Sequence, residues 1–320
     1  MSRMLRGGKQ MINLMDMSIP GMKTHLRLGT KYNKHIYTDA MSKIVKGVGG
    51  KQLFNLFDVS LRDGLQALKT PMLMKTKRDM LHNIISRNVK HIEIGSLVSP
   101  KILPQMADSV KLFEYSKTIG MDDINYYMLA PNSKYVSKAL DIGVENISLI
   151  TSVSNQFQLK NINKSLEHTK DDIDKSLSII SNSKLQVNNL KLYISCVNEC
   201  PIVGKISPSM IVREILYYAE YDDITNICLS DTCGTLSVDI FEQIMLILLL
   251  EGILPSRLSL HLHCNSNEME RVNSILKVCM SHGVTMVDVS FIESGGCSVT
   301  MSEEKINRNL SYLDIYDSLK

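Results

Sequence analysis

The sequence predicts one α/β domain, a (β/α)8 or TIM barrel, and three observations carry this prediction. Eight short runs of apolar and β-branched residues recur from residue 51 onward, separated by longer segments with helical spacing. No GxGxxG turn follows the first run, which disfavours an open doubly wound sheet, the alternative for this pattern. Ionisable residues gather at the ends of several runs, where a parallel barrel carries its active site.

The predicted strands follow one another at regular intervals. In chain order they cover residues 52–61, 90–96, 125–130, 146–153, 190–197, 226–231, 258–263 and 285–291. Parallel strands need crossover connections of a dozen or more residues, and the intervening segments are long enough to supply them.

The connecting segments carry helix signals. Ser207 and Pro208 begin one helix, with proline at a favourable first position. A second helix passes through 241–249 and ends at Gly252. Asn265 or Ser266 caps a third, in which the apolar residues fall on one face: Met269, Val272, Ile275, Leu276 and Cys279.

Composition limits the classes of partner. The 320 residues carry a net charge of +3, and no dense basic stripe with interleaved aromatic residues occurs, so we expect no nucleic-acid partner. The longest apolar run, residues 244–250, is too short to span a bilayer, and we expect no membrane partner.

The cysteines and the first 50 residues bear on the compartment. Seven cysteines, an odd number, and the lack of a recognisable secretory signal peptide predict a reducing compartment, cytoplasmic or mitochondrial; without a CxxC pair we expect no zinc ribbon. Residues 1–50 are basic and contain only Asp16 and Asp39 as acids; they form either a disordered extension or a transit peptide. Residues 47–50 read as a glycine-rich linker into a catalytic domain at 51–320.

Two histidines give the sharpest local signal. His261 and His263 point to the same face of one predicted strand, and Asp63 follows the first strand at the same barrel end. Two imidazoles and a carboxylate suit Mg, Mn, Fe or Zn. The alternative is a hydrogen-bonded histidine pair without a metal.

Other ionisable residues lie at the same end. Arg62 can stabilise an enolate or carboxylate oxygen, or it forms a salt bridge with Glu93 or Asp231. Cys297 follows two glycines in the loop after the eighth strand, where a thiol can act as an acid or a nucleophile.

Taken together, these motifs show a family resemblance. The sequence resembles 3-hydroxy-3-methylglutaryl-CoA (HMG-CoA) lyase, within the metal-dependent barrel superfamily that also holds isopropylmalate and homocitrate synthases. The similar stretches are SLRDGLQ (60–66), IEIGSLVSPKILPQMAD (92–108), LAPNSKY (129–135), KNINKSLE (160–167), YISCVNECPIVGKISP (193–208), SDTCG (230–234), HLH (261–263) and SGGC (294–297).

The resemblance implies a role for each matching residue. Asp63, His261 and His263 would ligate a divalent cation, Mg or Mn, with Asn309 as a fourth ligand and Asn307 as its rival. Arg62 would stabilise the enolate of departing acetyl-CoA, Cys297 would protonate it, and His261 or Asp63 would serve as base. Glu93 and Asp231 would support the site, and Arg62, Gln66 and Ser96 would bind an acyl-CoA substrate. Many such barrels form homodimers, which stays an open expectation here.

Three departures from the family leave alternatives open. Cys264 stands where the family has aspartate, which predicts the loss of a hydrogen-bond partner beside the metal. Residues 298–305 replace a glycine-rich segment of the family. Lys320 follows soon after the last helical stretch, which predicts a short last helix and a poorly covered flank of the barrel. The alternatives are a related acyl-CoA carbon–carbon lyase, a Claisen-type synthase, or a barrel without catalytic activity.

Overall fold

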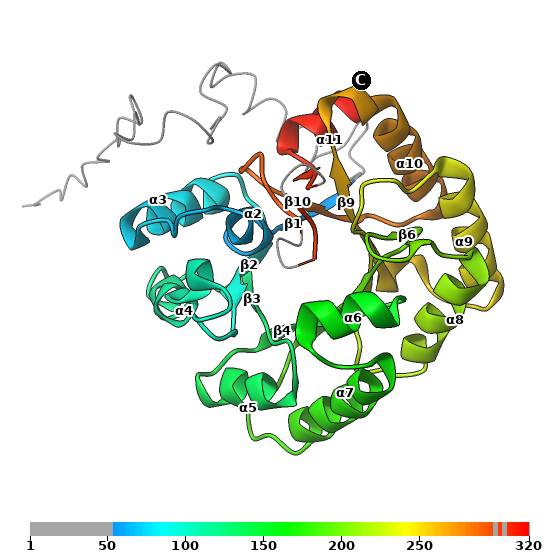
Figure 1. Ribbon diagram of the computed structural model, residues 1–320. Helices are drawn as coiled ribbons and strands as arrows, with labels where there is room; N and C mark the ends of the chain where they lie inside the picture. Colours follow the sequence, from blue (N-terminus) through cyan, green and yellow to red (C-terminus); the bar gives the residue numbers. More distant parts are fainter. Residues whose placement is uncertain (1–53, 297–299, 303–305, 320) are drawn as a thin grey trace, which may run out of the picture.

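Eight parallel strands close into a barrel inside a ring of helices (Figure 1). The computed structural model describes residues 54–296, 300–302 and 306–319. Closure comes from β10, which pairs with both β9 and β1, so the predicted (β/α)8 barrel is confirmed. Around the barrel the strands are β1 (Asn55–Asp58), β2 (His91–Ser96), β3 (Asn125–Leu129), β4 (Asn146–Ser152), β5 (Asn189–Ser195), β8 (Asn226–Asp231), β9 (Leu258–Cys264) and β10 (Met286–Val289).

The helices follow the strands in the predicted alternation. They are α2 (Asp63–Gln66), α3 (Met74–Ile85), α4 (Ser109–Lys117), α5 (Ser133–Asp141), α6 (Asn155–Ile162), α7 (Leu166–Ser181), α8 (Pro208–Ala219), α9 (Val238–Leu250), α10 (Met269–His282) and α11 (Tyr312–Ser318), with short 3-10 turns η2 (Pro104–Met106), η3 (Pro255–Arg257) and η4 (Ser266–Glu268). Pro208 begins α8 as predicted, and Asn265 caps η4 through a capping box with Glu268. None of the helices within the described ranges has the length and apolar composition needed to cross a bilayer.

The first strand ends earlier than the predicted 52–61. The Asp58 carboxylate accepts hydrogen bonds from the backbone N–H (2.9 Å) and the hydroxyl (3.0 Å) of Ser60. Such a local bond turns the backbone out of the sheet, so Arg62 and Asp63 stand above the strand end at the start of α2. The predicted extension 1–50 and its linker lie outside the described residues.

Two short pairings complete the rim at the carboxyl ends of the strands. A hairpin of β6 (Glu199–Cys200) and β7 (Gly204–Lys205) follows β5. The second, β11 (Arg308–Asn309), pairs antiparallel with the end of β9, which places Asn309 opposite His263.

The last helix is short, as predicted, but it covers its flank of the barrel. Tyr312 and Ile315 of α11 are buried, and the Tyr312 ring stacks on Phe291 with centroids 4.3 Å apart. The Tyr312 hydroxyl donates to the carboxylate of Asp58, the last residue of β1. The expected poor coverage is therefore wrong for this part of the barrel, because these apolar contacts close it.

Candidate functional site

The candidate metal centre lies at the carboxyl ends of the barrel strands. Asp63 begins α2, and His261 and His263 alternate along β9 so that both rings face the barrel interior. The two Nε2 atoms are 3.3 Å apart, and Asp63 Oδ2 lies 3.8 Å from Nε2 of His261 and 3.4 Å from that of His263. One potential ligand atom from each residue falls within 4.8 Å of the others, so the predicted trio can share one cation.

The partners of the ring nitrogens favour a cation between them. His263 Nδ1 lies 3.1 Å from the carbonyl oxygen of Asp231, which only accepts, so Nδ1 carries the proton. His261 Nδ1 lies 3.1 Å from the carboxylate of Asp288 and is protonated by the same reasoning. Two neutral rings then face each other with lone pairs on Nε2, an arrangement that needs a proton or a metal ion between them.

Asn309 supplies a candidate fourth ligand. Its Nδ2 donates to Asp63 Oδ2 (2.9 Å) and to the carbonyl oxygen of Ser294 (3.1 Å). Its Oδ1 is buried and has no hydrogen-bond partner among the described residues, which leaves an oxygen free to coordinate a cation. The rival, Asn307, instead donates to the carbonyl oxygen of Cys233 at 3.1 Å, away from Asp63.

Two glycines fit closely around these ligands. A Cβ on Gly295 would lie 2.3 Å from Asn309 Nδ2 and 2.9 Å from Asp63 Oδ2. The Gly296 N–H donates to Asp63 Oδ2 at 3.0 Å. The loop can therefore approach the centre only without side chains, and the donor set, the unpaired amide oxygen and this glycine cradle together fit a divalent cation.

Burial and charge shift the pKa values of the three candidate ligands in different directions: they favour ionised Asp63 and neutral His261, but a protonated His263 while no cation is bound. Burial opposes ionisation of Asp63, but the Arg62 guanidinium and the two histidines outweigh it and hold the pKa of this carboxyl well below its usual range. Burial lowers the pKa of His261. At His263 burial is outweighed by the hydrogen bond and the charge of Asp63, which raise its pKa.

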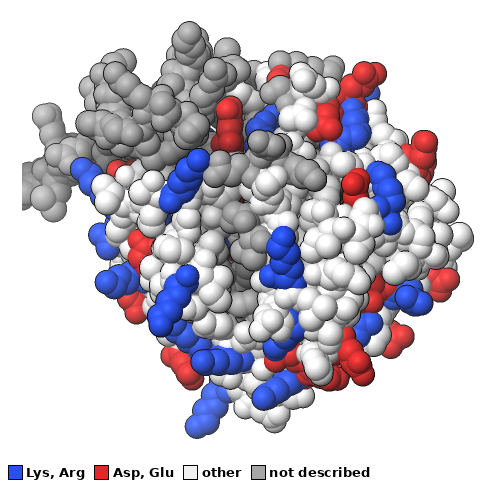
Figure 2. Space-filling view, viewed as in Figure 1, with Lys and Arg blue, Asp and Glu red and all other residues white. Residues whose placement is uncertain are grey.

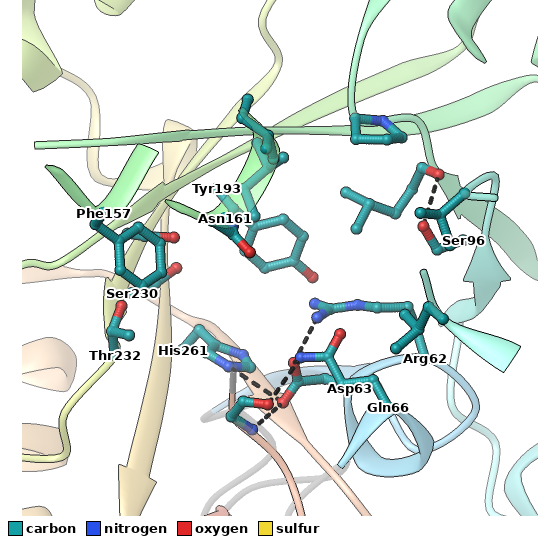
Figure 3. A pocket seen from close by; sticks show the side chains of 18 of the residues that line it. Arg62, Asp63, Gln66, Ser96, Phe157, Asn161, Tyr193, Ser230, Thr232 and His261 are labelled. Carbon is teal, nitrogen blue, oxygen red and sulfur yellow. Dashed lines mark hydrogen bonds and ion pairs between the residues drawn. The ribbon is translucent and has the colours of Figure 1, made fainter. Parts of the chain in front are cut away.

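Arg62 is buried between two carboxylates. Its Nε donates to Glu93 at 2.6 Å and its Nη1 to Asp63 at 2.5 Å, so the predicted salt bridge with Glu93 forms and one with Asp231 does not. The Tyr193 hydroxyl donates to the same Glu93 oxygen at 3.2 Å. Figure 3 shows the guanidinium directed into the pocket between Tyr193 and Asp63.

The remaining predicted residues line or support this pocket. Gln66 and Ser96 line it; Gln66 donates to Asp63 Oδ1 (2.7 Å) and to the carbonyl oxygen of Gly296 (2.9 Å), which ties the loop to α2. The Asp231 carboxylate accepts from the backbone of Thr235 and Leu236 and thus shapes the turn after β8. Cys297 lies outside the described residues.

Cys264 does not lie beside the metal ligands, contrary to the expectation that its position supplies a partner there. It follows His263 on β9, so its side chain points to the opposite face, where it is buried in the apolar core and pairs in register with Arg308. The partners of the histidines come from Asp231 and Asp288 instead. The six described cysteines are free thiols.

The sequence interpretation missed three buried side chains of the site. Tyr193 lines the pocket, and Lys191 and Asp288 form an ion pair of 2.5 Å behind His261. Burial opposes ionisation of Asp288, but the Lys191 ammonium outweighs it and lowers the pKa of the carboxyl. A signal was present, because a charged residue inside a strand of a closed barrel is costly to bury and requires a partner.

The pocket has a polar and an apolar side. The ligand residues and Arg62 occupy one side; the other is formed by apolar residues of the segments after β2, β3 and β4: Val98, Ile102, Leu103, Pro131, Phe157 and Ile162. Figure 2 shows the same face as Figure 1, with Lys and Arg side chains close to a central hollow.

The curated relatives and several similar solved structures are hydroxymethylglutaryl-CoA lyases. The chain is 30% identical over 263 residues to the mitochondrial hydroxymethylglutaryl-CoA lyase of Macaca fascicularis, covering 82% of this chain and 76% of the relative. It is 28% identical to the 3-hydroxy-3-isohexenylglutaryl-CoA/hydroxy-methylglutaryl-CoA lyase of Pseudomonas aeruginosa, covering 76% and 77%. A crystal structure of hydroxymethylglutaryl-CoA lyase from Pseudomonas aeruginosa is similar with a TM-score of 0.72 at 26% identity, covering 83% and 84%.

The fold and the site define a (β/α)8-barrel enzyme with a place for a divalent cation at its carboxyl-terminal rim. The sequence model of the HMGL-like family matches residues 53–318. The chain therefore belongs to the HMGL-like family and is a carbon–carbon lyase.

Proposed function

We propose that this lyase cleaves 3-hydroxy-3-methylglutaryl-CoA to acetyl-CoA and acetoacetate with the help of Mg or Mn. One observation carries the proposal: Arg62 lines the same pocket as Asp63, His261 and His263, whose donor atoms can share one cation, and the unpaired amide oxygen of Asn309 belongs to a side chain bonded to Asp63. The relatives named hydroxymethylglutaryl-CoA lyase, which align over at least three quarters of this chain, support the choice of substrate.

Asp63, His261, His263 and Asn309 would hold the cation. Mixed nitrogen and oxygen donors suit several divalent ions, and the oxygen ligands of Asp63 and Asn309 favour Mg or Mn. When bound, the cation supplies Lewis acidity toward the oxygen atoms of the substrate.

The cleavage begins with loss of the proton of the tertiary hydroxyl. His261 and Asp63 are the candidate bases. The Asp63 oxygens already accept hydrogen bonds from Arg62, Gln66, Asn309 and Gly296. His261 Nδ1 donates a hydrogen bond to the Asp288 carboxylate. Because His261 Nδ1 already carries a proton toward Asp288, Nε2 is its one basic atom, so His261 can receive the proton only when Nε2 does not coordinate the cation.

As the carbon–carbon bond breaks, negative charge moves to the thioester oxygen of the departing acetyl-CoA. The Arg62 guanidinium is oriented by Glu93 and Asp63 before the substrate arrives, so it can stabilise this enolate without reorganising. We assign protonation of the resulting carbanion to Cys297, on the basis of the family resemblance.

The substrate is an anionic thioester, and two features of the pocket suit it. Lys and Arg side chains surround the centre of the face seen in Figure 2, and an apolar wall of the pocket faces its polar side. Positive charge near the mouth attracts an anionic ligand, and the wall can cover the uncharged part of an acyl-CoA.

A lyase assay tests the proposal. The full chain is incubated with 3-hydroxy-3-methylglutaryl-CoA and Mg or Mn, with and without chelator, and acetoacetate is measured. We expect chelator-sensitive product that Cys297→Ala abolishes. A folded, metal-supplied chain that yields no acetoacetate would exclude this substrate and direct the search to other acyl-CoA esters.

A further inference from the structure

Two charged side chains lie behind the candidate metal centre, inside the barrel. Lys191 projects from β5 and Asp288 from β10, and each is 1% exposed. Lys191 Nζ lies 2.5 Å from Asp288 Oδ1, and Asp288 Oδ2 lies 3.1 Å from His261 Nδ1. Desolvating such a pair costs about as much as its attraction returns, so stability alone does not account for its presence.

The chemistry of the donors fixes the direction of both hydrogen bonds. A lysine ammonium can only donate, so Asp288 Oδ1 accepts from it. Asp288 Oδ2 is then presented to His261 as an acceptor, and His261 Nδ1 carries the proton. The lone pair stays on Nε2, the atom that faces His263 and Asp63.

Aromatic rings hold the Lys191 ammonium in this place. Nζ lies 3.5 Å from the ring centroid of Phe57 on β1 and 4.7 Å from that of Tyr193 on β5. A cation over ring faces is attracted by the π electrons, more strongly where water is excluded. The ammonium is thereby fixed by two rings and one carboxylate, so the carboxylate and the imidazole beyond it are fixed as well.

We propose that Lys191 and Asp288 are positioning residues, which hold His261 in the tautomer and orientation that ligate a divalent cation. They act through His261 and contact neither substrate nor ion. This inference rests on the proposed function only in assigning a metal to the site. It adds that metal affinity depends on Lys191, which acts on the ligand His261 through Asp288.

The test measures Mn²⁺ binding to the full chain after chelator treatment, with free Mn²⁺ counted by its electron paramagnetic resonance signal. Lys191→Met removes the charge and nearly keeps the length, and Lys191→Arg keeps the charge. Lys77→Met is the matched control, because Lys77 is also buried and ion-paired, to Asp108, but lies on α3 outside the barrel.

We expect Lys191→Met to weaken Mn²⁺ binding by about 10–100-fold, as loss of a group that orients a ligand does. Lys191→Arg binds more tightly than Lys191→Met, and Lys77→Met keeps the wild-type affinity despite lower thermal stability. Equal Mn²⁺ affinity of Lys191→Met and the wild type would overturn the proposal.

A second variant covers the case in which Lys191→Met does not fold. Asp288→Asn is nearly isosteric, and its amide can donate to Nδ1 and so favour the wrong tautomer; we expect weaker Mn²⁺ binding, and unchanged affinity overturns the proposal. If the wild type itself binds no Mn²⁺, the proposed function fails. The tautomer of His261 is then read from the nitrogen-15 NMR spectrum of the metal-free chain. A proton on Nδ1 in the wild type that is absent from Nδ1 in Asp288→Asn supports the proposal. A proton on Nε2 in the wild type refutes it.

Discussion

The side-chain amide of Asn309 lies 2.9 Å from the carboxylate of Asp63, although 246 positions separate the two residues in the chain. The two histidines of β9 come between these residues in the chain, and β11 pairs with β9 so that Asn309 is opposite His263. The candidate metal centre thus joins the first βα unit of the barrel to its last strand pairing.

Replacing Asn309 removes a candidate ligand and, at the same time, a hydrogen bond to the candidate ligand Asp63. We expect Asn309→Ala to weaken Mn²⁺ binding at least about tenfold, because the free amide oxygen and the hydrogen bond to Asp63 are both lost. Asn307→Ala is the matched control, since its amide bonds to Cys233, and it should bind Mn²⁺ like the wild type. Calorimetric titration of both variants checks this; the reverse order of affinities would assign the ligand to Asn307.

Alanine variants at Gly295 and Gly252 distinguish crowding at the candidate metal centre from backbone strain. Gly295→Ala places Cβ 2.3 Å from the Asn309 amide, so Asn309 or Asp63 must move and metal affinity must fall. Gly252→Ala, at φ +83° with open space around it, costs about 1–2 kcal/mol of stability through backbone strain but leaves metal binding intact. Thermal unfolding and Mn²⁺ titration of both variants distinguish the two effects; wild-type affinity in Gly295→Ala contradicts the described loop position.

Lysine cannot replace the guanidinium of Arg62. An ammonium cannot reach Glu93 and Asp63 in the same geometry and still present a donor to the pocket, so we expect Arg62→Lys to lower kcat by about 10²–10³-fold. Arg257→Lys is the control, because Arg257 donates to three backbone carbonyls away from the pocket and should affect stability only. Steady-state kinetics on the substrate proposed above gives the answer; a kcat for Arg62→Lys within a few-fold of the wild type would rule out its role at the enolate.

Asp58 gives the stability of the fold a pH dependence. Burial raises the pKa of Asp58 to about 6, despite hydrogen bonds from Tyr312 and Ser60. In the unfolded chain the group titrates near 3.9, so between about pH 4 and pH 6 the native state binds more protons and stability falls as pH rises, by about 3 kcal/mol in total.

Asp58→Asn removes this slope. Urea unfolding at pH 4, 5, 6 and 7 should therefore show the variant gaining stability relative to the wild type up to about pH 6 and no further above it. Asp123→Asn should instead lose stability relative to the wild type as pH rises, because the hydrogen bond from Lys90 lowers the pKa of the exposed Asp123 carboxyl. Parallel curves for the wild type and Asp58→Asn contradict the raised pKa.

Much of the site follows from rules that act along one strand. The alternation of side chains places His261 and His263 on one face, and the position of active sites in parallel barrels brings Asp63 to the same rim. The same alternation sends Cys264 to the other face, so the sequence already contained the reason why this substitution does not touch the ligands.

The missed residues depend on contacts that only barrel closure creates. Lys191 and Asp288 lie on β5 and β10, which are not neighbours in the sheet, and they meet across the interior over a sequence separation of 97. No local pattern gives that distance. Likewise, the position of Asn309 beside the histidines follows from its register opposite His263, which is set by the pairing of β11 with β9.

Because the candidate ligands lie far apart in the chain, they are synthesised at different times. A ribosome adds about 5–20 residues per second, so about 12–50 s pass between the emergence of Asp63 and that of Asn309. Throughout that interval a nascent chain has a carboxylate and, later, two imidazoles, but not the amide oxygen or the strand that brings it opposite them. The four candidate ligands therefore come together only after β11 has been synthesised and has paired with β9.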